Sequence, residues 1–161
     1  MSEIIETTED SVQETEDSSG EKYLIFSILE NLYSFPSRFI GEIAIFDTVY
    51  PLPLLPPYVL GVVNRYSVPY ALFDIGLLFY KKPSPHSKVL ILKDEIDRIA
   101  FLIDDVAGIA DVQQENLLSM ERSAESNDLT EAVSASFNWN GSDVFVLDIQ
   151  RILDRVTGET V

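Results

Sequence analysis

The 161-residue chain contains no cysteine. This absence excludes disulfide bonds, zinc–thiolate sites and a cysteine nucleophile, and it agrees with a reducing compartment. Basic residues are also few: 11 Lys and Arg stand against 27 Asp and Glu, a formal net charge of −16 at pH 7. We therefore expect no nucleic-acid binding, which needs cations to neutralise phosphates, and no docking on anionic lipid.

Long hydrophobic runs are absent as well. No apolar stretch reaches about 18 residues, so we expect no insertion into a membrane. The first residues lack a basic segment followed by an apolar core, so we predict no signal peptide and a cytoplasmic location. Apolar residues still make up 46% of the chain. That is enough for the core of one ordinary domain, or of two very small ones sharing a core.

Catalytic and cofactor-binding signatures are missing too. The single histidine, His86, sits in a Pro-Ser-Pro-His-Ser connector, where a solvent-exposed linker residue is favoured over a general base. The phosphate-binding patterns GxGxxG and GxxxxGK[ST] do not occur. The acidic run Asp94-Glu95-Asp97 lacks the glycine and the spacing of a calcium loop, and Asp104-Asp105 is placed to cap or close a strand. We predict no enzyme, no cofactor and no metal site.

Residues 1–21 form a separate compositional block. They carry eight acidic residues and no basic one, mixed with Ser, Thr and Gln. Such a segment cannot bury enough apolar area to offset the entropy lost on ordering, so we predict a disordered acidic tail. A solubilising tail is favoured over a docking arm.

After this tail, the pattern predicts short β-strands joined by polar turns, and one longer helix near the end of the chain. The apolar runs that alternate with turn residues lie at 23–28, 32–35, 58–63, 69–73, 88–92, 98–103, 133–137 and 143–147. The final helix opens at Asp148, and its apolar residues Ile149, Ile152, Leu153 and Val156 recur at helical spacing.

The pattern also repeats within the chain. An offset of 74 residues places Asn64 on Asn138 and Asp74 on Asp148, so an Asn-headed turn, an apolar strand and a helical turn recur in the same order. Both aspartates fall where a helix N-cap belongs. We therefore predict that they are caps and not a catalytic pair of carboxylates.

The repeat predicts two copies of one all-β unit, roughly 22–80 and 88–156. Units this small have marginal cores. We expect them to pack together or to exchange strands, with a seam between them where a partner can sit.

The most apolar stretch runs from Pro51 to Asp74 and begins with four prolines within seven residues. The prolines exclude a helix, and a hairpin is predicted directly after them. Two interpretations stay open for the apolar side chains in and before the proline segment. They plug the ends of a small barrel, or they form a docking surface for a protein, and each interpretation can hold for part of the set. The set is Ile45, Phe46, Val49, Tyr50, Leu52, Leu54 and Leu55.

The segment Pro56-Pro-Tyr-Val-Leu-Gly-Val-Val-Asn64, followed ten residues later by Asp74-Ile75, resembles the CheW family of chemotaxis coupling proteins. The family pattern at this place is PxxxxGVxNLRGxVxPVxDL. Four further segments resemble the family motifs FLVF, VxEI, VGLxVDxVxxV and LxLLDxxxLL, in that order. They are Tyr23–Phe26, Ile40–Ile43, Ile99–Ile109 and Val144–Leu153, and the whole resemblance covers about residues 22–156.

The resemblance implies an all-β domain over residues 22–158. Its fold would be two small five-stranded barrels sharing a core, with short helices and a C-terminal helix. It also implies a non-enzymatic adaptor that couples the cytoplasmic tip of chemoreceptors to the regulatory domain of the histidine kinase CheA. In the family, the receptor tip is a helical hairpin that sits in the groove between the two barrels.

The family's binding residues carry over by position. The receptor-side set is Ile40, Glu42, Gly61, Asn64, Arg65 and Tyr66, and the kinase-side set is Ile45, Phe46 and Val49.

The chain departs from the family in the NLRG turn. Tyr66-Ser67 occupies the Arg-Gly positions, and Arg65 lies one residue early. Arg65 can still reach Glu42, the partner of the family's arginine, but strand alternation then predicts Tyr66 on the other face. Two alternatives therefore accompany the adaptor hypothesis. One is a divergent paralogue that binds the kinase or another partner but not the common receptor. The other is a small double-barrel ligand-binding or accessory domain that uses the seam as a pocket.

Overall fold

The computed structural model describes residues 20–83, 88–93, 97–120 and 129–160. Nearly all of the predicted tail (1–19), together with His86, Asp94 and Glu95, lies outside the described residues. The first strand begins at Glu21, which sequence alone had placed at the end of the tail.

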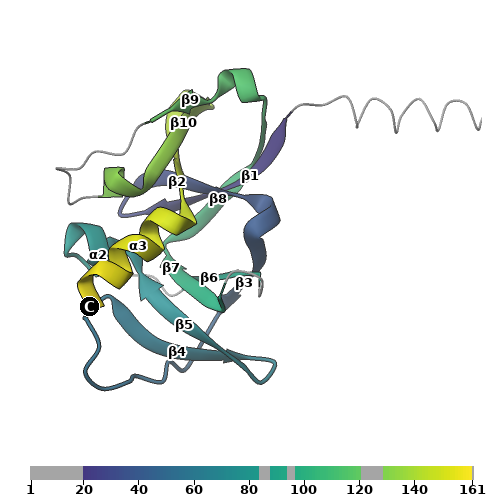
Figure 1. Ribbon diagram of the computed structural model, residues 1–161. Helices are drawn as coiled ribbons and strands as arrows, with labels where there is room; N and C mark the ends of the chain where they lie inside the picture. Colours follow the sequence, from purple (N-terminus) through teal and green to yellow (C-terminus); the bar gives the residue numbers. More distant parts are fainter. Residues whose placement is uncertain (1–19, 84–87, 94–96, 121–128, 161) are drawn as a thin grey trace, which may run out of the picture.

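Two sheets make up the body of the molecule (Figure 1). The first has six strands in the order β8-β1-β2-β11-β10-β9. Its strands are β1 (Glu21–Ile28), β2 (Asn31–Pro36), β8 (Asp105–Val112), β9 (Leu118–Ser119), β10 (Val133–Trp139) and β11 (Ser142–Leu147).

The second sheet has five strands in the order β3-β6-β7-β5-β4. Its strands are β3 (Ile40–Ile45), β4 (Val59–Arg65), β5 (Val68–Asp74), β6 (Lys88–Leu92) and β7 (Ile99–Ile103). Short helical segments join or follow the strands: η1 (Ser37–Phe39), α2 (Ile75–Tyr80), η2 (Gln114–Asn116), η3 (Leu129–Ala132) and the C-terminal α3 (Ile149–Thr160).

The predicted fold class is confirmed as mostly β, with two sheets, short helices and a C-terminal helix. Within the described part of the chain, neither sheet closes on itself by strand pairing. The edge strands are β8 and β9 in the first sheet, and β3 and β4 in the second. Between Gln113 and Met120 the chain forms a 3-10 turn, η2, followed by the two-residue strand β9.

The two halves of the chain exchange strands. β1 and β2 of the first half pair with β8 and β11 of the second, whereas β6 and β7 of the second half pair with β3 and β5 of the first. Each sheet therefore takes two strands from one half and the rest from the other. Neither half is a structural unit by itself, because neither contains all the strands of a sheet.

The two equivalent hairpins confirm the offset of 74. Each has a two-residue loop whose central residues adopt positive φ: Tyr66 (53°) and Ser67 (65°) between β4 and β5, and Asn140 (52°) and Gly141 (83°) between β10 and β11. Positive φ at both central residues is the conformation of a type I′ turn, whose twist matches that of paired strands. Asn138, which precedes the second loop, accepts a hydrogen bond on Oδ1 from Gly141 N at 3.3 Å.

Both predicted N-caps are confirmed. Asp74 Oδ1 accepts a hydrogen bond from Leu77 N at 3.0 Å at the start of α2. Asp148 Oδ1 accepts one from Arg151 N at 3.2 Å at the start of α3. Asp74 can be almost completely buried because its carboxylate accepts this hydrogen bond from the backbone of α2.

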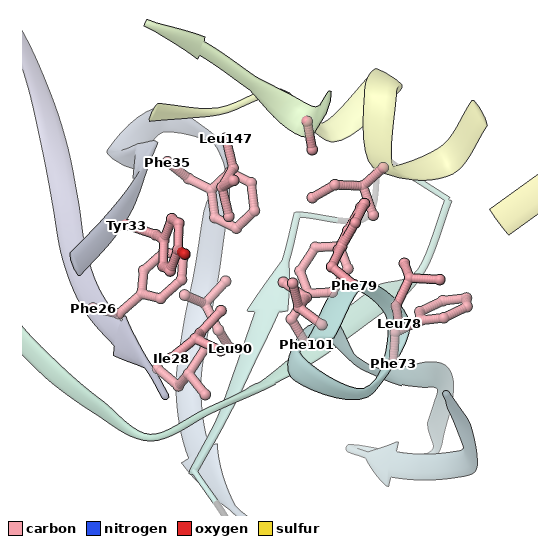
Figure 2. Packing of buried hydrophobic residues seen from close by; sticks show 14 of the residues in the cluster. Phe26, Ile28, Tyr33, Phe35, Phe73, Leu78, Phe79, Leu90, Phe101 and Leu147 are labelled. Atoms are coloured by element: carbon pink, nitrogen blue, oxygen red, sulfur yellow. The ribbon is translucent and has the colours of Figure 1, made fainter. Parts of the chain in front are cut away.

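One hydrophobic core joins the two sheets. Figure 2 shows its aromatic rings, which form a chain from the first sheet to the second. Phe26 of β1 stacks on Phe35 of β2 at 5.4 Å, Phe35 on Phe101 of β7 at 5.6 Å, and Phe101 meets Phe73 of β5 at 6.2 Å between ring centroids. α3 covers this core through the fully buried Ile152. A shared core is what two marginal units need for stability.

Candidate protein-docking surfaces

The Glu42–Arg65 pair joins the two edge strands of the second sheet. Arg65, the last residue of β4, donates from Nε to Glu42 Oε1 at 3.0 Å and from Nη2 to Oε2. Glu42 lies on β3, and the two strands occupy opposite ends of the sheet. This two-bond geometry is the strong form of a guanidinium–carboxylate pair. The predicted contact is therefore confirmed, although Arg65 stands one residue earlier than the family's arginine.

The directions in which the pKa values of Glu42 and Arg65 shift follow from this geometry. The hydrogen bond from Arg65 stabilises the ionised carboxylate and lowers the pKa of Glu42 below its ordinary value, and the pKa of Arg65 rises in turn. The side chains of Arg65 and Glu42 keep 33% and 31% of their surface exposed. Their attraction is therefore partly screened by water, and a partner can still reach both.

Tyr66 lies on the same side as Arg65, not on the opposite face. The Arg65 Cζ atom is 4.6 Å from the centroid of the Tyr66 ring, and it also lies 5.9 Å from that of Phe46. The prediction from strand alternation was wrong because Tyr66 is the first turn residue, with positive φ, and no longer belongs to the strand. Its side chain is 80% exposed.

A cleft of about 330 Å³ opens beside this pair. Its lining combines residues of β3, β4 and β6, the turn, and buried side chains of the second sheet. The lining residues are Gly41, Glu42, Arg65, Tyr66, Tyr70, Ile91, Leu92 and Lys93. The structure thus brings together three of the six receptor-side residues named by the resemblance: Glu42, Arg65 and Tyr66.

The other three lie apart from the cleft lining. Ile40 starts β3 and packs half-buried against the shared core. Asn64 is exposed on β4, beside Arg65. Gly61 is buried and has φ +139°, because the backbone of Tyr50 crosses directly over it. A Cβ there would lie 2.3 Å from Tyr50 O, so the fold itself requires this glycine. A receptor role for these three residues stays a prediction.

The kinase-side residues divide into two groups. Ile45 is 65% exposed on the solvent side of edge strand β3, and Ile43 beside it is also exposed. Phe46 and Val49 are half-buried and pack against the apolar cluster inside the second sheet. The interpretation as a plug of the sheet's interior therefore holds for Phe46 and Val49. Ile45 is exposed, and its role in docking stays a prediction.

The proline segment presents further apolar surface. Tyr50, Leu52 and Leu55 are exposed, and Leu54 is fully exposed with φ +62°. The segment is held in place by a pair of backbone hydrogen bonds between Tyr50 and Val62 of β4, at 2.8 and 2.9 Å. The proline segment therefore presents an apolar surface that these hydrogen bonds hold against β4, an edge strand of the second sheet.

A second groove lies on the six-stranded sheet, where segments from the two halves of the chain meet, and the sequence did not identify its residues. Its volume is about 600 Å³. It is lined by β1, η1, β10, β11 and the start of α3, with Asp97 from the turn before β7. The apolar lining residues include Tyr23, Phe39, Leu117, Ile149 and Leu153, and the charged ones Glu21, Arg38, Asp97 and Asp148. The repeat predicted a seam, but these residues come from segments far apart in the chain, so no local motif marks them.

The described residues contain no group of three or more His, Cys, Asp or Glu side chains that could hold a metal ion. In the same part of the chain, no helix is long and apolar enough to cross a membrane.

Comparison with known proteins agrees with this arrangement of strands. The model of the CheW-like domain matches residues 22–157. Among solved structures, the chain is similar to the crystal structure of the scaffolding protein TtCheW from Thermoanaerobacter tengcongensis. That likeness has a TM-score of 0.70 and 15% sequence identity, and it covers 81% of this chain and 85% of that one. No curated protein matches at the threshold applied. CheW-like domains form a non-catalytic family, in agreement with the prediction of no enzyme. The chain belongs to the family of CheW-like domains.

Proposed function

We propose that the chain is a chemotaxis adaptor that couples chemoreceptors to the histidine kinase CheA in a receptor array. The observation that carries this proposal is the CheW-like domain over residues 22–157, together with the fold likeness to a scaffolding protein. The chain would act in the cytoplasm, by holding two partners in fixed geometry so that the state of the receptor biases the activity of the kinase.

The receptor side is assigned to the cleft with Glu42, Arg65 and Tyr66, and to the neighbouring residues Ile40 and Asn64. The support is geometric, since one ion pair fixes the cleft side chains while leaving them exposed. The buried Gly61 would serve this side indirectly, because it allows Tyr50 to pair with β4.

The kinase side is assigned to the outer surface of β3 and the start of the loop that follows it. Ile45 supplies exposed apolar area there, of the kind that anchors protein interfaces. Phe46 and Val49 support the surface from beneath, since they pack against the interior of the second sheet.

The experiment is a binding assay with the isolated CheA regulatory domain and with chemoreceptor tip hairpins. We expect micromolar binding of the kinase domain, and Ile45→Asp should weaken it at least about tenfold. Ile109→Asp is the control, because it makes the same change at an isoleucine of similar exposure (62%) on β8, an edge strand of the other sheet. No kinase complex at micromolar concentrations would contradict the adaptor function.

A kinase-binding paralogue without the common receptor is the second candidate. The specific observation in its favour is Tyr66-Ser67 at the positions of the family's Arg-Gly. In the same assay, this candidate predicts binding of the kinase domain but of none of the receptor tips.

A further inference from the structure

The repeat of 74 residues makes the start of α3 equivalent to the start of α2, yet the two are covered to different extents. At α2, the N-cap Asp74 and the first helical residue Ile75 are buried, with 1% and 0% of their surface exposed. At α3, their counterparts Asp148 and Ile149 are half-buried and line the groove of about 600 Å³. The same helix start is therefore closed in one half of the chain and open in the other.

Leu29 closes the start of α2. It stands in the two-residue turn between β1 and β2, with φ +50°, and packs against the shared core. A Cβ placed on Gly76 of α2 would lie 3.3 Å from Leu29 Cδ1, so the leucine lies directly against the helix. The turn is fastened there, because Leu29 N donates a hydrogen bond to Asp104 Oδ2 at 2.8 Å. The cover of this helix start is thus one aliphatic side chain on a tight turn.

The corresponding turn in the second half has a different chemistry. β6 pairs with β7 as β1 pairs with β2, at an offset of 66 residues, which places Glu95 on Leu29. Glu95 lies outside the described residues, but it carries a carboxylate, which is costly to bury against an apolar core. The counterpart of Gly76 is Gln150, which is exposed and lines the groove. By sequence, this turn therefore offers no leucine for the start of α3.

The groove has an apolar lining that an aliphatic side chain can fill. Four of its lining residues pack in one cluster within the six-stranded sheet: Tyr23, Leu117, Ala135 and Val146. Leu153 of α3 lines it too, at the position that Phe79 occupies in α2. Phe79 is 5% exposed, whereas Leu153 is half-buried. An added leucine therefore removes further apolar surface from water, which favours binding.

The charged residues of the lining favour a cationic partner. Arg38 and Glu21 form an ion pair with each other. The other two charged lining residues, Asp97 and Asp148, are both acidic, and the chain as a whole has a formal net charge of −16. Asp97 is exposed in the turn before β7, where a lysine or arginine of a partner can reach it. Opposite charges across an interface speed association and disfavour partners of the wrong sign.

We propose that this groove is a docking site for a protein segment that presents a leucine on a tight turn with a lysine or arginine beside it. The leucine takes the place at α3 that Leu29 takes at α2, and the cation meets Asp97. No lining residue belongs to the receptor-side or kinase-side sets, and none is shared with the cleft beside Glu42 and Arg65. The site therefore serves a third protein partner, beyond the proposed coupling of receptor and kinase.

The probe is a synthetic hairpin peptide with Leu-Gly in a type I′ turn and a lysine on each side of that pair. It is titrated into the isotope-labelled full chain and followed by NMR. We expect shifts of the amide signals of the groove residues Tyr23, Leu117, Ile149 and Leu153. Two control peptides carry Ala-Gly in the turn or glutamates in place of the lysines. Each should bind at least about tenfold more weakly.

Substitutions at exposed positions test the site on the protein. Gln150→Trp places a large ring at the groove and should weaken peptide binding at least about tenfold. Gln114→Trp is the control, because it makes the same change at an exposed glutamine outside the groove lining. Asp97→Asn removes the charge, tolerates the positive φ, and should weaken binding about twofold to fivefold. Its control is Asp111→Asn, at an exposed aspartate of β8 that does not line the groove.

Groove signals that do not shift at millimolar peptide would overturn the inference, and so would normal binding by Gln150→Trp. Equal binding of the glutamate peptide, or no effect of Asp97→Asn, would overturn the cationic part of the partner. Gln150→Trp should bind the CheA regulatory domain and the receptor tips as the wild type does, and loss of either would overturn a separate third site. Failure of the wild type to bind the kinase domain contradicts the proposed function but leaves this inference standing.

Discussion

Arg65 and Glu42 connect the two strands that end the five-stranded sheet. The six-stranded sheet has a counterpart at the equivalent positions, where Trp139 stands in place of Arg65 and Gly108 in place of Glu42. A Cβ on Gly108 would lie 2.9 Å from Trp139 Cζ2, so the indole packs directly on this glycine. The same connection across a sheet is made by an ion pair in one case and by an aromatic ring in the other.

Charge reversal at the ion pair tests its contribution. Glu42→Arg or Arg65→Glu alone places like charges together, and each should lower both the melting temperature and receptor-tip affinity. The double variant restores opposite charges and should recover most of both. Loss of tip binding in the double variant, with its stability recovered, would contradict a direct role for the pair in binding.

The depressed pKa of Glu42 predicts a dependence on pH. A carboxyl group whose pKa is lower in the folded state adds stability that is complete above its unfolded pKa and is lost as the pH falls through its folded pKa. The ordinary value here is 4.5. The stability advantage of the wild type over Glu42→Gln should therefore narrow as the pH falls from neutral through and below 4.5. An advantage that stays constant in urea unfolding across this range would rule out the assigned cause.

Gly61 and Gly141 form a matched pair for backbone strain. Both have positive φ, but a Cβ on Gly61 would collide with the backbone of Tyr50, whereas one on Gly141 would meet nothing within 4 Å. We expect Gly61→Ala to reduce the free energy of unfolding by about 3 kcal/mol. Gly141→Ala should cost about 1 kcal/mol, from the conformation alone. Equal costs in urea denaturation would show that the Tyr50 segment moves away freely.

The single tryptophan offers an optical test of the first sheet. Gly108→Ala places a methyl group against the Trp139 ring, and overpacking should cost about 1 to 2 kcal/mol. The ring must shift outward, so its fluorescence maximum should move to longer wavelength. The neighbouring exposed change Ala107→Ser is the control and should leave the spectrum unchanged. An unaltered spectrum in Gly108→Ala would contradict the contact.

Substitutions of Asp74 test whether this residue acts as a helix N-cap or through its carboxylate charge. Asp74→Ala removes the acceptor for Leu77 N and should lower the free energy of unfolding by about 1 kcal/mol or somewhat more, because the site is buried. Asp74→Asn keeps a capping oxygen and should retain most of the stability. If Asn is as damaging as Ala in thermal unfolding, the carboxylate charge itself matters and capping is an incomplete explanation.

Ile45 and Phe46 should respond differently to the same charge. Phe46→Asp buries a carboxylate against the cluster inside the second sheet and should cost about 2 kcal/mol or more. Ile45→Asp is exposed and should cost about 0.5 kcal/mol or less. Any loss of kinase binding by Phe46→Asp must therefore be read beside its stability. A fully stable Phe46→Asp would mean that Phe46 belongs to the docking surface after all.

Much of the local structure was predictable from sequence. The Asn64/Asn138 and Asp74/Asp148 correspondences located both type I′ hairpins and both N-caps, since turns and caps depend on residues close together in the chain. The Glu42–Arg65 contact could also be predicted, because a long side chain at the end of a strand has few other partners. The face on which Tyr66 lies could not be predicted, because it depends on where the strand ends and the turn begins.

The sequence by itself determined the mostly-β class, the internal repeat, the family and the caps. Each of these follows from residue type and spacing along the chain. Only the tertiary structure decided that the halves exchange strands, that segments of both halves form a groove of about 600 Å³ on the six-stranded sheet, and that Phe46 and Ile45 face different environments. These features depend on which strands lie side by side. Two halves with the same pattern can pair within themselves or across, and burial of one shared core selects the exchange.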